Sequence, residues 1–453
     1  MEEGGLDEGG MTREQFLELF GEGVSQRDYA KAAAACKERL KASPDDAYAA
    51  KLRRTIEGFL DAADELEPAA EEEKEAAPLL PELRARAELA SSRAFEAMNE
   101  YLQDRKELWE LGEQAVGIFW DVGQVAPRGS QRDRLWEISK GLSEALEEQL
   151  RAASETEVPS APPAKLSNVE WLHEALGQLW WRRELGLAEK DWMLEGCRAR
   201  WKQCAGSMQA LVGRSLPGLA VSDGSELCDL LTQTWGLERS LVCGLLGDGL
   251  PALEYGVEAV FAEIGRRPLV EPPLEGFYDC FYVMTHVVYV LNSYNGCLPN
   301  RRFDCPWVFA YLERCLGFWL REVGSGGGDD HAAAWEGSNS WRSEAVDAIA
   351  EAVDCLRGFE GEEPSDLVRQ GLAWLLERQE PDGFFRSPGA PSKQETGYDQ
   401  LHPTWTAVAA LQLEREVRPD GASPLCKIWA DYAREKAVAV SLATAPPPRL
   451  PEI

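Results

Sequence analysis

The chain has 453 residues, of which 44% are hydrophobic and 9% aromatic, so it can fill a substantial core. Its formal net charge of −31 at pH 7 argues against binding to nucleic acid, because the phosphate backbone would repel it. Eleven cysteines without any CxxC pair predict reduced, buried thiols rather than a zinc cage.

The chain shows neither a secretory signal nor a membrane span. Its first eleven residues are acidic and rich in glycine, and the longest apolar run, 281–291, is too short to cross a bilayer. We therefore expect a cytoplasmic protein with no integral membrane segment.

Helical patterns dominate the chain from its beginning, and no stretch keeps the two-residue alternation of a strand. Residues 29–60 have the pattern of a single tetratricopeptide-like hairpin, and residues 81–104, 108–122 and 131–153 predict an antiparallel bundle. We assign residues 1–153 to an N-terminal helical domain, whose helices could recruit a protein partner.

Residues 154–166 are rich in proline and serine, as is typical of an interdomain linker. A second helical domain follows over residues 167–438, and the proline-rich residues 439–453 predict a disordered tail. The expected helices of the second domain begin with a tryptophan-rich one after Ser167 and then cover residues 189–212, 224–246, 251–264, 276–292, 306–323, 340–357, 365–379, 403–416 and 423–436.

Residues 369–385 show a distinctive order: a basic residue, a glycine, an aromatic residue, two leucines, a glutamine, a glycine and a final aromatic residue. This stretch resembles the QW repeat of the terpenoid cyclases and protein prenyltransferase β-subunits, with phenylalanine in place of the last tryptophan. The resemblance implies an α/α toroid, a ring of helical hairpins around a central cavity. The matching residues are Arg369, Gly371, Trp374, Leu375, Leu376, Gln379, Gly383 and Phe385.

The segment after this repeat is similar to the inner helix of the prenyltransferase β-subunits whose histidine binds zinc. Tyr398, Asp399 and His402 supply the similarity. The Asp-x-Cys pair that would complete the zinc site is missing, as are the DxDD and DDxxD motifs of the cyclases. We therefore assign no metal site, identify no cofactor and leave open whether the chain is a cyclase-like or transferase-like enzyme.

The expected helix 276–292 is apolar on nearly every side, which predicts that it is buried. Its polar residues Asp279, Tyr282, His286 and Tyr289 recur at helical spacing and form one stripe. A buried aspartate and histidine must be hydrogen-bonded or face a wet cavity, so the stripe is either a satisfied part of the core or a wall of a pocket.

The expected helix 340–357 carries Glu344, Asp347, Glu351 and Asp354 opposite its apolar side. On a surface helix these carboxylates would form an ordinary solvated face. On an inner helix they would line the cavity, where paired acids can serve acid–base chemistry on a sugar.

Three functions follow as hypotheses. The first is a cavity that binds a small apolar or isoprenoid-like molecule, with His286 or His402 as acid or base. The second is a non-catalytic scaffold, in which the N-terminal helices and the acidic surface recruit protein partners. Separately, His402 could merely cap or pack at a helix start before Pro403. The third is a carbohydrate-active toroid that uses the carboxylates of residues 340–357. For the first we expect Asp279 or Asp399 to orient the histidine, and Tyr282, Tyr289, Tyr398 and Trp405 to bind the ligand.

Overall fold

The structure is a computed structural model that divides into two compact units, residues 1–77 and 78–453. The expected tetratricopeptide-like hairpin and the proline-rich tail lie outside the residues that it describes. Those residues run from 81 to 439, without 128, 156–167, 217–223, 268, 273, 275, 298–305, 325–343, 360–363, 388–396 and 416–423.

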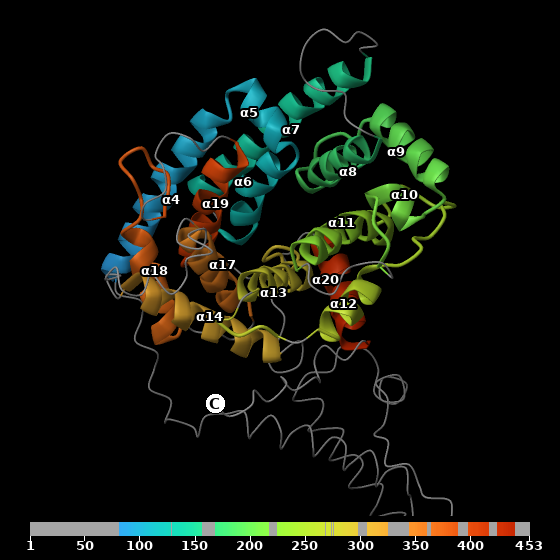
Figure 1. Ribbon diagram of the computed structural model, residues 1–453. Helices are drawn as coiled ribbons and strands as arrows, with labels where there is room; N and C mark the ends of the chain where they lie inside the picture. The colour runs from blue at the N-terminus through green and yellow to red at the C-terminus, as the bar shows by residue number, and fades with distance from the viewer. Residues whose placement is uncertain are drawn as a thin grey trace, which may run out of the picture. The chain divides into compact units, whose positions relative to one another are not determined.

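The described part of the chain is all-α, as the sequence predicts, and contains no strand (Figure 1). An isolated bridge between Gln379 and Phe385 is its nearest approach to β-structure. The helices are α4 (Pro81–Tyr101), α5 (Arg105–Leu111), α6 (Gln114–Val125), α7 (Ser130–Glu155), α8 (Asn168–Glu184), α9 (Asp191–Cys204), α10 (Met208–Val212), α11 (Gly224–Val242), α12 (Val257–Gly265), α13 (Phe277–Asn292), α14 (Pro306–Gly324), α17 (Ala345–Arg357), α18 (Asp366–Leu376), α19 (Tyr398–Leu411) and α20 (Pro424–Ala439).

Local sequence explains where several helices begin and end. The side chains of Asp104 and Ser365 accept hydrogen bonds from backbone N–H groups at the starts of α5 and α18. Gly112 has a positive φ of 61° after α5, so the expected helix 108–122 is interrupted there. Ala205 and Gly206, with φ of 49° and 73°, similarly separate α9 from α10.

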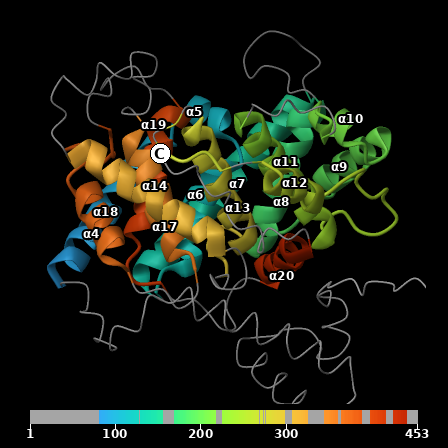
Figure 2. The ribbon, with the colours of Figure 1, turned by 60° about the horizontal axis from the view of Figure 1, so that its bottom comes forward.

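Six helices form the inner layer around the site, and each packs against an outer partner. The pairs are α6 with α7, α8 with α9, α11 with α12, α13 with α14, α17 with α18, and α19 with α4. The first members contact one another in the order α6, α8, α11, α13, α17 and α19, and α19 contacts α6 again. Figure 1 shows these helices arranged about a common centre, and Figure 2 shows the same helices from another side.

The QW-like stretch, residues 369–385, connects α18 and the turn after it to α4, the first described helix. The Gln379 side chain donates a hydrogen bond of 2.7 Å to the carbonyl oxygen of Ala90 in α4. Arg93 of the same helix donates to the carbonyl oxygens of Glu380 and Pro381 at 3.2 and 3.1 Å. Residues about 290 positions apart in the sequence are therefore held together by the turn after α18.

These contacts place the N-terminal helices differently from the expectation. The compact unit begins at residue 78, and α4 contacts α18 and α19 while α7 contacts α8. Helices that precede and follow residues 154–166 in the sequence therefore share one core.

The core is filled by large apolar side chains, and Trp180, Trp201, Trp319 and Trp429 are among the most deeply buried. All described cysteines are free thiols, and each is buried or half-buried, in agreement with the sequence-based expectation. Within the described ranges, no helix combines the length and the apolar character that a membrane crossing requires.

Candidate functional site

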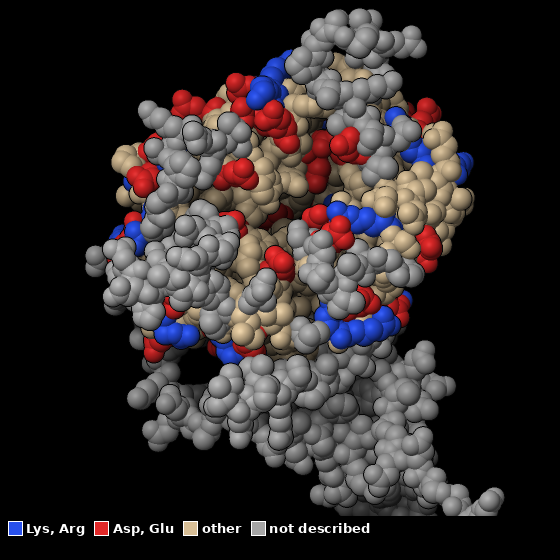
Figure 3. Space-filling model, viewed as in Figure 1, with Lys and Arg blue, Asp and Glu red and all other residues tan. Residues whose placement is uncertain are grey.

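The inner helices enclose a cavity of about 800 Å³. Figure 3 shows the hollow, with acidic side chains on its walls. Its lining comes from α6, α8, α11, α13, α17 and α19, with contributions from α5, α20 and the residues after α13. Six tryptophans are part of it, namely Trp109, Trp120, Trp180, Trp181, Trp235 and Trp405. A concave site with aromatic walls and a few converging polar groups is typical of ligand-binding pockets.

One wall carries a histidine between two carboxylates. His402 of α19 lies with Nδ1 3.0 Å from Oδ1 of Asp347 and with Nε2 3.9 Å from Oε1 of Glu351, both on α17. Asp347 and Glu351 are only 4% and 1% exposed. His402 and Glu351 line the cavity, whereas Asp347 holds the imidazole from behind.

Hydroxyl groups surround the two carboxylates. The Tyr282 hydroxyl donates to Asp347 Oδ2, and the Thr406 hydroxyl lies 3.0 Å from Asp347 Oδ1. The Thr285 hydroxyl donates to Glu351 Oε2 at 2.7 Å. Burial, assisted by the negative charge of Asp347, raises the pKa of Glu351 well above its usual value, so this carboxyl tends to keep its proton.

His286 and Tyr289 of the predicted polar stripe also line the cavity. Nδ1 of His286 lies 2.8 Å from the carbonyl oxygen of Tyr282, one turn earlier in α13. Burial, with a further contribution from His402, lowers the pKa of His286 to about 3, so its imidazole is neutral. The ring of Tyr289 stacks on that of Tyr294 with centroids 4.9 Å apart.

Two aromatic side chains predicted from the sequence lie beside His402. The Tyr398 ring stacks on the imidazole with centroids 4.6 Å apart, and Trp405 meets the imidazole edge-on at the same distance. Both line the cavity. The structure thus brings together His286, Tyr289 and the aromatic residues of α19 on one cavity.

The two aspartates expected to orient the histidines lie outside the lining of the cavity. Asp399 is exposed at the first turn of α19, and neither it nor Asp279 belongs to the described lining of the cavity. Asp279 packs beside Gly224 at the start of α11, where an added Cβ would lie 2.5 Å from it. Asp347 occupies the orienting position instead, because α17 packs against α19.

Two further expectations need correction. The helix containing His402 begins at Tyr398, so His402 lies within its second turn and Pro403 is inside the helix. The carboxylates of α17 do not form a solvated face, since every residue from Ala345 to Arg357 is buried. Two of the four carboxylates, Glu351 and Asp354, line the cavity, whereas Glu344 and Asp347 do not.

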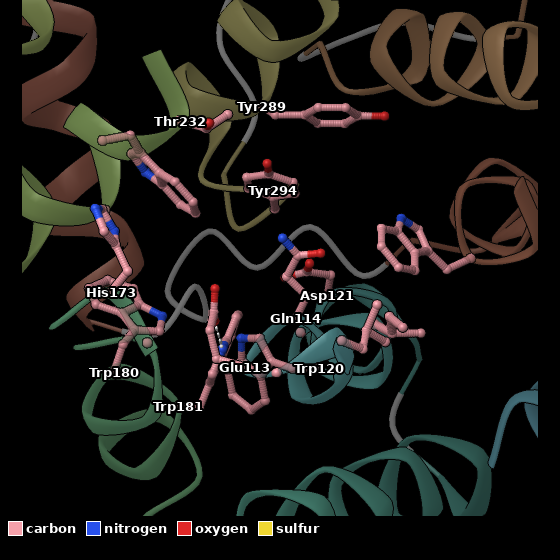
Figure 4. Close-up of a pocket in the computed structure, with 18 of the residues that line it drawn as sticks. Glu113, Gln114, Trp120, Asp121, His173, Trp180, Trp181, Thr232, Tyr289 and Tyr294 are labelled. Atoms are coloured by element: carbon pink, nitrogen blue, oxygen red, sulfur yellow. Dashed lines mark hydrogen bonds between the residues drawn. The ribbon is translucent and has the colours of Figure 1, made fainter. Parts of the chain in front are cut away.

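A second wall, which α6 and α8 build around three acids, was not predicted from the sequence. Figure 4 shows Glu113 and Asp121 on this wall, with Trp120, Trp180 and Trp181 nearby. Glu113 accepts a hydrogen bond of 2.6 Å from Trp181 Nε1, and its backbone N–H donates to Glu174 at 3.0 Å. Asp121 could have been predicted as a cavity residue, because it is the one acid in the otherwise apolar stretch QAVGIFWDVGQV of α6.

Burial dominates the protonation of these three acids. It raises the pKa of Glu113 and, more strongly, that of Asp121. Burial, together with the charge of Glu113, raises the pKa of Glu174 to about 7. Near neutral pH the wall therefore carries less negative charge than its composition indicates.

Asp347, Glu351 and His402 could also hold a metal ion. One ligand atom from each lies within 4.8 Å of the others. Two carboxylates and an imidazole suit a divalent cation, although the hydrogen bonds already described satisfy the same atoms.

None of the protein-family models, curated proteins or solved structures compared with this chain matches it. Its function is therefore inferred from the chemistry of the cavity.

Proposed function

We propose that this chain is an α/α-toroid enzyme that performs acid–base chemistry on a hydroxyl-rich substrate of the carbohydrate class. The observation that carries the proposal is the convergence of His402, Asp347 and Glu351 on a large cavity with tryptophan walls. The closed order of contacts among the inner helices supports the toroid.

The three side chains have complementary roles in this proposal. Asp347 accepts a hydrogen bond from the Nδ1–H group of His402, which leaves Nε2 free to act as a base toward a water or a substrate hydroxyl. Glu351 keeps its proton because it is buried beside Asp347, so it can donate that proton to a leaving oxygen. Such a pair contributes roughly 10²–10⁴-fold to a rate.

The acids around the cavity favour a substrate with many hydroxyl groups. A purely apolar ligand would remove water from the half-buried Glu113 and Asp121 without replacing its hydrogen bonds, and each unsatisfied group costs about 1–3 kcal/mol. Sugar hydroxyls can donate to these carboxyl groups, while indole rings such as Trp181 can cover the apolar face of a sugar ring.

An isoprenoid-like ligand is the second candidate, and the rings around His402 favour it. Tyr398 and Trp405 lie 4.6 Å from the imidazole, where their π-systems could stabilise a cationic intermediate next to the proton donor. This function is the one implied by the QW-like stretch.

Tryptophan fluorescence distinguishes the two substrate classes. We expect neutral mono- and disaccharides to change the emission of the purified protein in a saturable way, whereas farnesol should not. Saturable binding of farnesol without binding of any saccharide would favour the isoprenoid function and contradict the proposal.

Turnover of a bound saccharide then tests the catalytic roles. We expect Asp347→Asn to lower kcat by roughly 100-fold or more with little change in KM, because Asp347 acts on the imidazole and not on the substrate. Asp399→Asn is the matched control, since Asp399 is exposed on α19, and it should behave as the wild type. Equal activity of both variants would exclude the proposed dyad.

A further inference from the structure

Arg239 of α11 is a buried cation on the wall of the cavity. Only 4% of the residue is exposed. Its guanidinium carbon lies 3.9 Å from the ring centroid of Trp180 in α8 and 4.0 Å from that of Trp235, one turn earlier in α11. Two indole rings therefore fix the plane of the guanidinium.

The N–H groups of Arg239 have no acceptor among the described residues. Its Nε is fully buried without a hydrogen-bond partner. The two terminal nitrogens also make no hydrogen bond or ion pair to those residues. Unlike Nε, they are not fully buried. Because the faces of the guanidinium are stacked on indoles, its remaining edge is directed to the cavity that Arg239 lines.

We propose that Arg239 binds a carboxylate of the substrate, so that the preferred ligand is an acidic sugar such as a uronate. A buried guanidinium without acceptors is costly, whereas a carboxylate can accept two parallel hydrogen bonds from its edge. The carboxylate site follows from Arg239 alone, and the sugar class rests on the proposed function.

The surroundings of Arg239 favour a carboxylate over a phosphate. Glu113 and Asp121 lie close enough for the positive charge of Arg239 to lower their pKa values, although burial outweighs this effect in both. A monoanion matches the charge of one guanidinium, and the raised pKa values of the two acids reduce their repulsion of it. A phosphate dianion would place a second negative charge near the same two carboxyl groups without a second cation.

Fluorescence titration of the full chain with paired ligands tests the site. The pairs are glucuronate against glucose, and benzoate against benzyl alcohol, so that a carboxylate is examined with and without a sugar. We expect each carboxylate to bind at least tenfold more tightly than its neutral partner. Glucose 6-phosphate should bind more weakly than glucuronate.

Variants of Arg239 show whether this residue causes the preference. Arg239→Met should abolish it, and Arg239→Lys should weaken it several-fold because lysine lacks the planar fork. Arg200→Met is the matched control, since Arg200 stacks on Trp171 at 3.7 Å away from the cavity, and it should keep the preference. Should Arg239→Met fail to fold, the lysine variant gives the answer.

The outcomes separate the two proposals. Binding of benzoate that depends on Arg239, without binding of any sugar, would keep the carboxylate site and overturn the carbohydrate class. Binding of glucose equal to that of glucuronate would overturn the carboxylate site while leaving the carbohydrate class intact. A preference for carboxylates that survives in both Arg239 variants, or tighter binding of the phosphate, would also overturn the site.

Discussion

Burial raises the pKa values of individual carboxyl groups in the cavity. Glu174 is the clearest case, because burial and the charge of Glu113 raise its pKa to about 7 from an ordinary value of 4.5. Between these two pH values the folded chain holds a proton that the unfolded chain has released. The free energy of unfolding must therefore decrease as the pH rises through this window and become constant above it.

The variant Glu174→Gln tests this effect at one residue. Between pH 5.5 and pH 8 the wild type should lose about 2 kcal/mol more stability than the variant, since a shift of one pKa unit corresponds to about 1.4 kcal/mol. Urea unfolding at the two pH values measures the difference. Glu148→Gln is the control, because Glu148 is exposed on α7, and it should follow the wild type. Parallel pH dependence of wild type and Glu174→Gln would show that Glu174 is not perturbed.

The candidate site was partly predictable at the scale of residues. His286 and Tyr289 were predicted from helical spacing, because a polar stripe on an apolar helix must meet other polar groups or a cavity. The acid beside His402 was not predicted. Asp399 is near His402 in the sequence, but the acid near it in space is Asp347. Which acid reaches a histidine depends on the packing of α17 against α19, and no local pattern encodes that packing.

Helices were the most predictable feature at the scale of elements. Apolar periodicity and capping residues placed most of them within a few residues, but the glycine at 112 and the pair 205–206 divided two helices that periodicity alone joins. The amphipathic pattern of α17 had two interpretations. Both faces of this helix are buried, and a polar face against a cavity has the same sequence pattern as one against solvent.

A glycine in the QW-like stretch is required by the packing of α18 on α17. A Cβ added to Gly371 would lie 2.6 Å from Cγ2 of the buried Val353. Gly371→Ala should therefore lower the free energy of unfolding by up to about 2 kcal/mol, because overpacking costs about 1–3 kcal/mol and helix propensity returns about 1 kcal/mol.

The control for this prediction is the same substitution on a different helix. Gly141 in α7 is exposed, and an added Cβ would contact nothing within 4 Å. Gly141→Ala should stabilise the chain by up to about 1 kcal/mol, so the two substitutions have opposite signs in urea unfolding. If Gly371→Ala also stabilised, the close approach of α18 to α17 would be incorrect.

The organisation of the whole molecule was the least predictable from sequence. The composition of residues 154–166 is that of a linker, and it suggested a domain boundary. The contacts between helices on the two sides of this segment join residues far apart in the chain, such as Gln379 and Ala90. A single sequence contains no direct signal for such pairs, because each partner satisfies only its own local pattern.

Fragments of the chain test whether residues 78–453 are one cooperative unit. The fragment 78–453 should unfold in a single thermal transition and keep the near-ultraviolet circular dichroism of packed tryptophans. The fragment 167–453 should lose both, because it lacks α6, whose Trp120 meets Trp181 at 6.4 Å, and α4, which covers α19. Cooperative unfolding of the fragment 167–453 with a native near-ultraviolet spectrum would instead establish an independent domain beginning at α8.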